Sequence, residues 1–167
     1  MALLKQPSLQ DQALFNRPVQ EEPQPEEPEQ NAWVAVAALA VGIGQAILEE
    51  TQSLAAGRTQ SGKPLNASQA LQWKLADLAT DLEAAELLTL RAAWLMDQSK
   101  PFEKEAAMAK QYALNMVLKA SRDAIQIQAG HGYALRNPLL RLIQDAEGCQ
   151  LFNIYDEPLT GIIAKNL

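Results

Sequence analysis

The chain has 167 residues, of which 48% are hydrophobic, 20% are charged and only 5% are aromatic. This length suits one domain with a sizeable core, and the abundance of alanine and leucine beside few aromatic residues favours packed helices over a sheet. A phosphate backbone or an anionic bilayer would repel the net charge of −6, so we expect neither nucleic acid nor a membrane as a partner.

The number of cysteines and the sequence of the amino terminus indicate the cellular compartment. Cys149 is the only cysteine, which excludes an internal disulfide and a cysteine metal cluster. The amino terminus lacks a basic segment followed by an apolar one, so the sequence predicts no signal peptide. These features together predict a cytoplasmic protein.

Residues 1–31 differ in composition from the rest of the chain. The first thirty residues hold five of the nine prolines, and six acidic residues against two basic ones. The run "EEPQPEEPEQ" cannot bury enough apolar surface to offset the entropy of ordering it. We therefore expect an extended acidic arm over residues 1–31, followed by one helical domain over residues 32–167.

The first helix is expected over Trp33–Ala56. Gly57 follows it, and glycine suits the left-handed conformation that often ends a helix. The most apolar segment, Ala32–Leu48, is too short to span a bilayer, which takes about 20 residues, and contains Gln45. We interpret it as a buried helix of a bundle.

Two further long helices are predicted. Asn66 and Gln69 have the spacing of a capping box, which would open a helix that continues to about Gln98. Pro101 would open the next one. Both helices carry apolar residues at helical spacing, which are Leu71, Leu75, Leu78, Leu82, Ala85 and Leu88 in one and Ala106, Ala109, Ala113, Val117, Ala120, Ala124 and Ile127 in the other. The small residues of the latter predict close contact between helices.

Two short helices complete the expected fold. Asn137 with Pro138 would open one, and Asp156 with Pro158 the other. We expect no strand of any length. The sequence therefore predicts an all-α fold, an up-down bundle of three long helices and two short ones.

The segment "QIQAGHGY" at residues 126–133 holds the only histidine, His131, between two glycines. It could be a nucleotide-binding loop, a histidine active site or the end of a helix. One histidine and one cysteine supply too few ligands for a metal site, and no nucleophile motif supports a Ser–His–Asp arrangement. The pairs Glu49–Glu50 and Glu83–Glu86 are interpreted as solvated helix faces. The residues alone thus indicate a helical domain with an acidic arm.

Three blocks in sequence order carry a more specific signal. They are "GRTQSGKPLNASQALQWKLADLATDLEAAELLTLRAAWL", then "KEAAMAKQYA", then "DAIQIQAGHGYALRNPLLRLIQDAEGCQLFNIYDE". This order resembles the carboxy-terminal helical domain of the acyl-CoA dehydrogenase family, over about Ala32 to Leu167. The resemblance implies a flavoprotein oxidoreductase family that acts on acyl-CoA thioesters, as in fatty acid metabolism.

The resemblance implies that one end of the domain meets FAD held by a neighbouring subunit. In the family, the block like "QIQAGHGY" ends a long helix, and its glutamine and glycine backbone contact the adenosine diphosphate part. Gln126 and Gly130 match that pattern, and Arg58 stands where an arginine pairs with the pyrophosphate. Ala129 replaces the first of two family glycines, and Ser61 replaces a phenylalanine that packs on the cofactor. His131 is then a loop residue.

The resemblance also implies that the catalytic base is missing. Asn153 occupies the position of the family's glutamate base, and an amide has no useful basicity. Some relatives place the base on the first helix, but the matching segment here, residues 31–33, is Asn-Ala-Trp. Asp156 and Glu157 match the following helix, so we assign no catalytic residue in this chain.

Family members carry a helical domain and a β-barrel domain ahead of this one, which hold most of the flavin and the acyl-CoA pocket. We therefore expect this chain alone to be inactive, and to act as a structural or accessory subunit that pairs with itself or with a fuller acyl-CoA dehydrogenase chain. One alternative is a subunit of a split FAD-dependent dehydrogenase that completes a partner's FAD site. Another is a cofactor-free helical interaction module.

Overall fold

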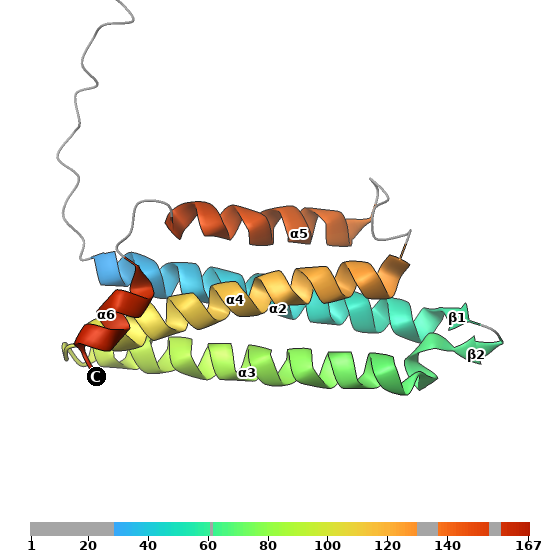
Figure 1. The fold of residues 1–167 in the computed structure, drawn as a ribbon, viewed down its shortest axis with the longest axis horizontal. Coiled ribbons are helices and arrows are strands. Elements are labelled where there is room, and N and C mark those ends of the chain that lie inside the picture. The colour runs from blue at the N-terminus through green and yellow to red at the C-terminus, as the bar shows by residue number, and fades with distance from the viewer. Residues whose placement is uncertain (1–28, 61, 130–136, 154–157) are drawn as a thin grey trace, which may run out of the picture.

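The computed structural model describes residues 29–60, 62–129, 137–153 and 158–167, with no account of the side chain of Asn153. Within these residues the chain forms an up-down bundle, in which successive long helices run in opposite directions (Figure 1). The helices are α2 (Glu29–Gly57), α3 (Gln69–Asp97), α4 (Glu103–Gln128), α5 (Pro138–Cys149) and α6 (Leu159–Lys165). The predicted all-α bundle of three long and two short helices is confirmed.

The start of α2 differs from the prediction. The helix begins at Glu29, four residues before Trp33, so residues 29–31 belong to the helix and not to the arm. No proline follows Pro28 in this region, and the acidic Glu29 in the first turn suits the positive end of the helix dipole. The predicted end at Gly57 is confirmed. The arm itself, residues 1–28, lies outside the described residues.

The connection from α2 to α3 was also predicted incorrectly. Two short strands, β1 (Thr59–Gln60) and β2 (Lys63–Pro64), pair antiparallel there, although no strand was expected. A 3₁₀ turn, η1 (Leu65–Ala67), follows and contains Asn66. Ser68 therefore caps α3, without a side-chain hydrogen bond, and the predicted capping box of Asn66 and Gln69 does not form. The hairpin and the 3₁₀ turn that follows it form just before the helix, and this local structure competes with the capping pattern.

The starts of the later helices agree more closely with the sequence. Asn137 caps α5 as predicted, because its Oδ1 accepts a hydrogen bond from the amide of Leu139 at 2.9 Å, with Pro138 in the first turn. The third helix begins at Glu103, two residues after Pro101. α6 begins directly after Pro158. A second 3₁₀ turn, η3 (Gln150–Asn153), continues α5.

The core lies where α4 packs against α2 and α3, with α5 and α6 covering it. The small residues of α4 are buried as predicted, from Ala106 to Ala124. Gly44 of α2 faces this seam, and a β-carbon there would lie 2.9 Å from Cε of Met116 and 3.2 Å from Cδ1 of Leu82. Glycine thus permits the close approach of α2 to α3 and α4.

α2 is long and apolar enough to cross a membrane by length and composition, with a mean hydropathy of 1.7 in its most apolar window. Half of that window is buried inside the bundle, and a core helix passes the same test of length and composition. Trp33, Ala37, Ala40 and Ile47 contribute to the shared core. The structure therefore supports the interpretation of residues 32–48 as a bundle helix.

Candidate functional site

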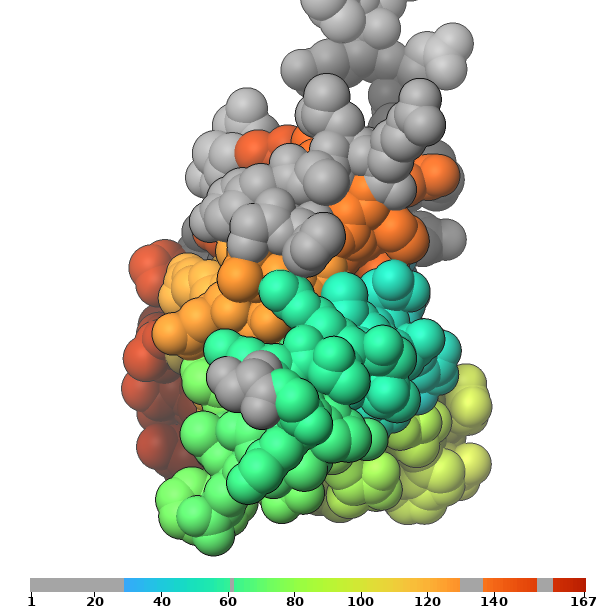
Figure 2. All heavy atoms as spheres, turned by 90° about the vertical axis from the view of Figure 1, so that its right-hand side faces the viewer, coloured from blue at the N-terminus to red at the C-terminus, as the bar shows by residue number. Residues whose placement is uncertain are grey.

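Arg58 and the end of α4 meet at one end of the bundle. Arg58 directly follows α2, and one of its Nη atoms donates a hydrogen bond to the carbonyl oxygen of Gln128 at 3.1 Å. Figure 2 shows this end of the molecule, with the hairpin next to the end of α4. Arg58 is half-buried, and its guanidinium group carries five N–H donors, so one carbonyl contact leaves it able to bind an anion as well.

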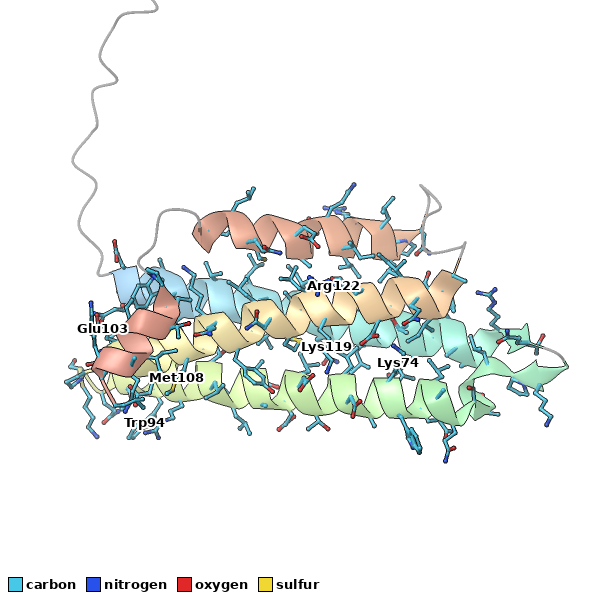
Figure 3. The ribbon with its side chains drawn as sticks, in the orientation of Figure 1. Lys74, Trp94, Glu103, Met108, Lys119 and Arg122 are labelled. Carbon is cyan, nitrogen blue, oxygen red and sulfur yellow. The ribbon has the colours of Figure 1, made fainter. Side chains whose placement is uncertain are left out.

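Gln126 lies on the last turns of α4 and is exposed. Its Oε1 accepts a hydrogen bond from Nζ of Lys74 at 2.9 Å, and Lys74 also forms an ion pair with Asp123. Lys74 points from α3 toward α4 (Figure 3). Sequence reasoning missed Lys74, because the pairing of two residues 52 positions apart depends on how the helices pack.

Gln128 and Ala129 shape the end of α4. Gln128 is fully buried, and its Oε1 accepts a hydrogen bond from Nδ2 of Asn137, which connects α4 to the start of α5. Its Nε2 has no hydrogen-bond partner among the described residues. Ala129 follows with φ 52° and ψ −135°, a conformation that residues with a β-carbon rarely adopt. Gly130, His131 and Ser61 lie outside the described residues, so the predictions for them stay untested.

A second group of residues lies at the other end of α4, around Asn153. Asn153 is the last residue of η3, and Asp156 and Glu157 lie outside the described residues. The carbonyl oxygen of Phe152 accepts a hydrogen bond from Nζ of Lys110 at 3.1 Å. Lys110 is 1% exposed, and its Nζ lies 5.8 Å from the centroid of the Trp33 ring.

This lysine connects two segments that are far apart in sequence. Trp33 belongs to the first turns of α2, and Phe152 to the turn that ends in Asn153. The two places where a base was sought, residues 31–33 and residue 153, are therefore both close to residues that contact the Lys110 ammonium group. Residues 31–33 contain no acid, and residue 153 is an amide.

A shallow pocket of about 390 Å³ lies beside this turn, between α2 and α5. Leu39, Ile43, Cys149 and Phe152 contribute to its lining. Cys149 is buried, and this burial raises the pKa of its thiol, with a smaller contribution from the charge of Asp145. A buried thiol of raised pKa is a poor nucleophile at neutral pH.

No group of three or more histidine, cysteine, aspartate or glutamate side chains that could hold a metal ion occurs in the described part of the chain. The glutamate pairs lie on helix surfaces, with Glu83 and Glu86 exposed on α3. Among the described residues, the first site presents Arg58, Lys74, the amide of Gln126 and the carboxylate of Asp123, and the second presents Lys110.

A family profile described as "Acyl-CoA dehydrogenase, C-terminal domain" matches residues 30–167. The chain belongs to the acyl-CoA dehydrogenase family. Among curated relatives, the probable acyl-CoA dehydrogenase YngJ of Bacillus subtilis is 41% identical over 134 residues, which cover 80% of this chain and 35% of that protein. The mitochondrial short-chain specific acyl-CoA dehydrogenase of Bos taurus is also 41% identical over 134 residues, which cover 32% of that protein.

Solved structures agree with this assignment to the acyl-CoA dehydrogenase family. Butyryl-CoA dehydrogenase from Megasphaera elsdenii aligns with a TM-score of 0.78 and 33% identity over 82% of this chain and 36% of that one. A structure of PigA with FAD and proline aligns with a TM-score of 0.76 and 28% identity, over 81% of this chain and 35% of that one. The chain thus spans about a third of the length of the proteins that it matches, and corresponds to the C-terminal domain.

Proposed function

We propose that this acyl-CoA dehydrogenase C-terminal domain is an accessory helical subunit that completes the diphosphate edge of an FAD held by a fuller acyl-CoA dehydrogenase chain, without supplying a base. The observation that carries the proposal is the placement of Arg58 against the end of α4, where Gln126 and Lys74 also lie. Arg58 follows α2 and contacts the carbonyl oxygen of Gln128 at the end of α4, while Lys74 of α3 contacts Gln126 two residues earlier on α4.

The chemistry of these donors fits a diphosphate. An anion with several oxygens requires positive charge and N–H donors, which Arg58, Lys74 and the amide of Gln126 supply. The backbone of Ala129 has a positive φ. Ala129 is next to Gly130, whose backbone is expected to contact the diphosphate. The PigA structure with which this chain aligns is a complex with FAD and proline, which supports FAD as the cofactor.

In this proposal, the residues of this chain bind and orient, while the partner holds the rest of the cofactor. FAD, when bound, would accept a hydride from an acyl thioester. Arg58 would pair with the diphosphate, and Gln126 would donate a hydrogen bond beside it. Asn153 would occupy the base position without taking a proton, so the α-proton would have to be removed by a carboxylate of the partner.

The first test uses the native complex, purified from the cells that make it. We expect a flavin spectrum in the complex and little flavin in the isolated chain, because the chain supplies only one edge of the site. In the complex, Arg58→Ala should weaken FAD retention by about 1.5–3 kcal/mol, the scale of one charge-assisted hydrogen-bonded contact. Equilibrium dialysis followed by the flavin absorbance measures this loss.

Lys63→Ala is the matched control, because Lys63 is an exposed cation of the neighbouring hairpin with no assigned contact to the cofactor. Equal losses in the two variants would show that Arg58 acts only through general charge. A complex of this chain with a partner but without flavin would favour the cofactor-free interaction module. Stoichiometric FAD on the isolated chain would overturn the accessory role.

The second test concerns the base. Asn153→Glu places a carboxylate at the family position, and general-base catalysis typically contributes a factor of 10²–10⁴. We expect no acyl-CoA oxidation by the isolated variant, and at most weak added activity beside a flavin-bearing partner. Reduction of an artificial electron acceptor with a panel of acyl-CoA thioesters measures it. Robust turnover by the unmodified chain alone would contradict the assignment.

A further inference from the structure

We propose that Lys74 is a positioning residue, which fixes the side-chain amide of Gln126 so that its Nε2 hydrogens face outward as donors. The role follows from the contacts of Lys74, while the identity of the group that accepts those hydrogens rests on the proposed function. Lys74 lies in the first of the three sequence blocks, where the sequence analysis assigned it no role.

The argument begins with the chemistry of the two side chains. A lysine ammonium group has three N–H donors and no acceptor, so it can hydrogen-bond only to the oxygen of an amide. Nζ of Lys74 lies 2.9 Å from Oε1 of Gln126. The amide orientation is therefore determined by the lysine, and the Nε2 hydrogens are directed away from it. Gln126 is exposed, so these hydrogens can reach a ligand.

Asp123 holds the lysine in place. Asp123 and Gln126 are three residues apart on α4, so both side chains lie on the same face of the helix, opposite Lys74 on α3. The side chains of Lys74 and Asp123 are 38% and 24% exposed, so water screens this pair less than a fully exposed one. Lys74 thus bridges α3 and α4 through two acceptors on one helix face (Figure 3).

The result is a defined pattern of donors at this end of the bundle. The outward amide hydrogens of Gln126 and the guanidinium group of Arg58 both suit phosphate oxygens. Arg58 and Lys74 contribute two positive charges against the one negative charge of Asp123. The class of ligand that this pattern fits is the diphosphate of a nucleotide.

The test needs neither a partner nor enzyme activity. In nuclear magnetic resonance spectra of the full chain, the side-chain amide of Gln126 should give a distinct, motionally restricted pair of signals in the wild type. In Lys74→Met these signals should move toward those of an unstructured glutamine. Lys74→Arg should retain them, because a guanidinium group is also a donor without an acceptor.

Lys119→Met is the matched control. Lys119 forms a similar ion pair across the same two helices, at 2.6 Å from Asp81, but does not contact Gln126. It should leave the Gln126 signals unchanged. Signals of Gln126 that are already those of an unstructured glutamine in the wild type, or an equal effect of Lys119→Met, would overturn the proposal.

A titration of the same samples with ADP separates this inference from the proposed function. We expect millimolar ADP to shift the Gln126 signals, and its dissociation constant to rise at least threefold in Lys74→Met. If the Gln126 signals depend on Lys74 but ADP does not shift them, the positioning role is supported. The same result counts against the proposed contact with the diphosphate of FAD.

Discussion

Ala129 ends α4 in a backbone conformation that favours glycine, with φ 52° and ψ −135°. In the family pattern a glycine precedes Gly130, and this chain has alanine at that position. The β-carbon crowds the neighbouring carbonyl in this region of φ and ψ, at a cost of about 1–3 kcal/mol. The backbone conformation at position 129 thus explains why the family pattern has a glycine there, independently of any cofactor.

Ala129→Gly should therefore stabilise the domain by about 1 kcal/mol. Relief of the strain exceeds the added entropy of glycine in the unfolded chain, which costs about 0.4–1 kcal/mol. Chemical denaturation measures the free energy of unfolding. Ala79→Gly, at an exposed position inside α3, is the control and should destabilise by about 1 kcal/mol. A loss of stability in both variants would show that Ala129 is not strained.

Cys149 gives a prediction for alkaline pH. Burial raises the pKa of its thiol, so the folded state keeps the proton to a higher pH than the unfolded state does. Below about pH 8.5, the pKa of an unperturbed thiol, this group makes its full contribution to the free energy of unfolding. That contribution falls as the pH rises above this value. The decline between pH 7 and pH 10 should be steeper in the wild type than in Cys149→Ala. Parallel profiles would exclude this contribution.

At the scale of elements, η3 depends on a contact from a distant helix. A four-residue 3₁₀ turn has few internal hydrogen bonds, and two of its side chains, Leu151 and Phe152, are exposed. The buried Lys110 donates to the carbonyl oxygen of Phe152 and lies beside the Trp33 ring. We infer that α4 and α2 hold the turn that ends in Asn153 through this lysine.

Lys110→Met should loosen η3. A hydrogen bond from a charged group contributes about 1.5–3 kcal/mol, and 1.4 kcal/mol corresponds to a factor of ten in an equilibrium. Backbone amides of residues 150–153 should therefore exchange with solvent about tenfold faster or more, while those in the middle of α5 change less. Lys104→Met, on the first turn of the same helix, is the control. Unchanged exchange in η3 would mean that other contacts hold this turn.

The helices could be predicted from the sequence because their signals are local. Apolar residues at helical spacing place the buried faces of α3 and α4, and Asn137 with Pro138 predicts the start of α5. The start of α3 could not be predicted in the same way, because a short hairpin forms just before it and moves the cap from Asn66 to Ser68. The hairpin consists of two strands of two residues each, which is too short for an alternating pattern.

The candidate site could be predicted only in part. Arg58 and Gln126 follow from the order of three sequence blocks, and the structure places Arg58 against the end of α4. Lys74 and Lys110 were not found, since each depends on contacts between segments 42 or more positions apart. A lysine that is buried or paired in the fold looks like any surface lysine in the sequence. Such residues become visible only when helix packing is known.

At the scale of the whole molecule, the apolar surface lies elsewhere than the sequence indicated. The apolar stripes of α2 and α4 are buried within the domain itself, so they leave no surface for the expected pairing of the chain with itself. The exposed apolar side chains lie on α3 instead. Trp73, Leu87, Leu90 and Trp94 are each more than half exposed. Trp73, Leu87 and Trp94 are separated by multiples of seven residues, so they form one row along the outer face of α3.

Four large apolar side chains on one exposed helix face favour a partner surface, which for an isolated chain is a second copy. We expect the full chain to be at least a dimer at micromolar concentration. Analytical ultracentrifugation over a dilution series measures the dissociation constant. Leu90→Glu should raise it tenfold or more, because full burial of one leucine contributes about 1.5–3 kcal/mol. Leu39→Glu is the matched control, since Leu39 is 49% exposed on α2 beside the pocket next to Phe152. A stable, soluble monomer would contradict the prediction, and a larger effect of Leu39→Glu would place the contact on α2 and α5 instead.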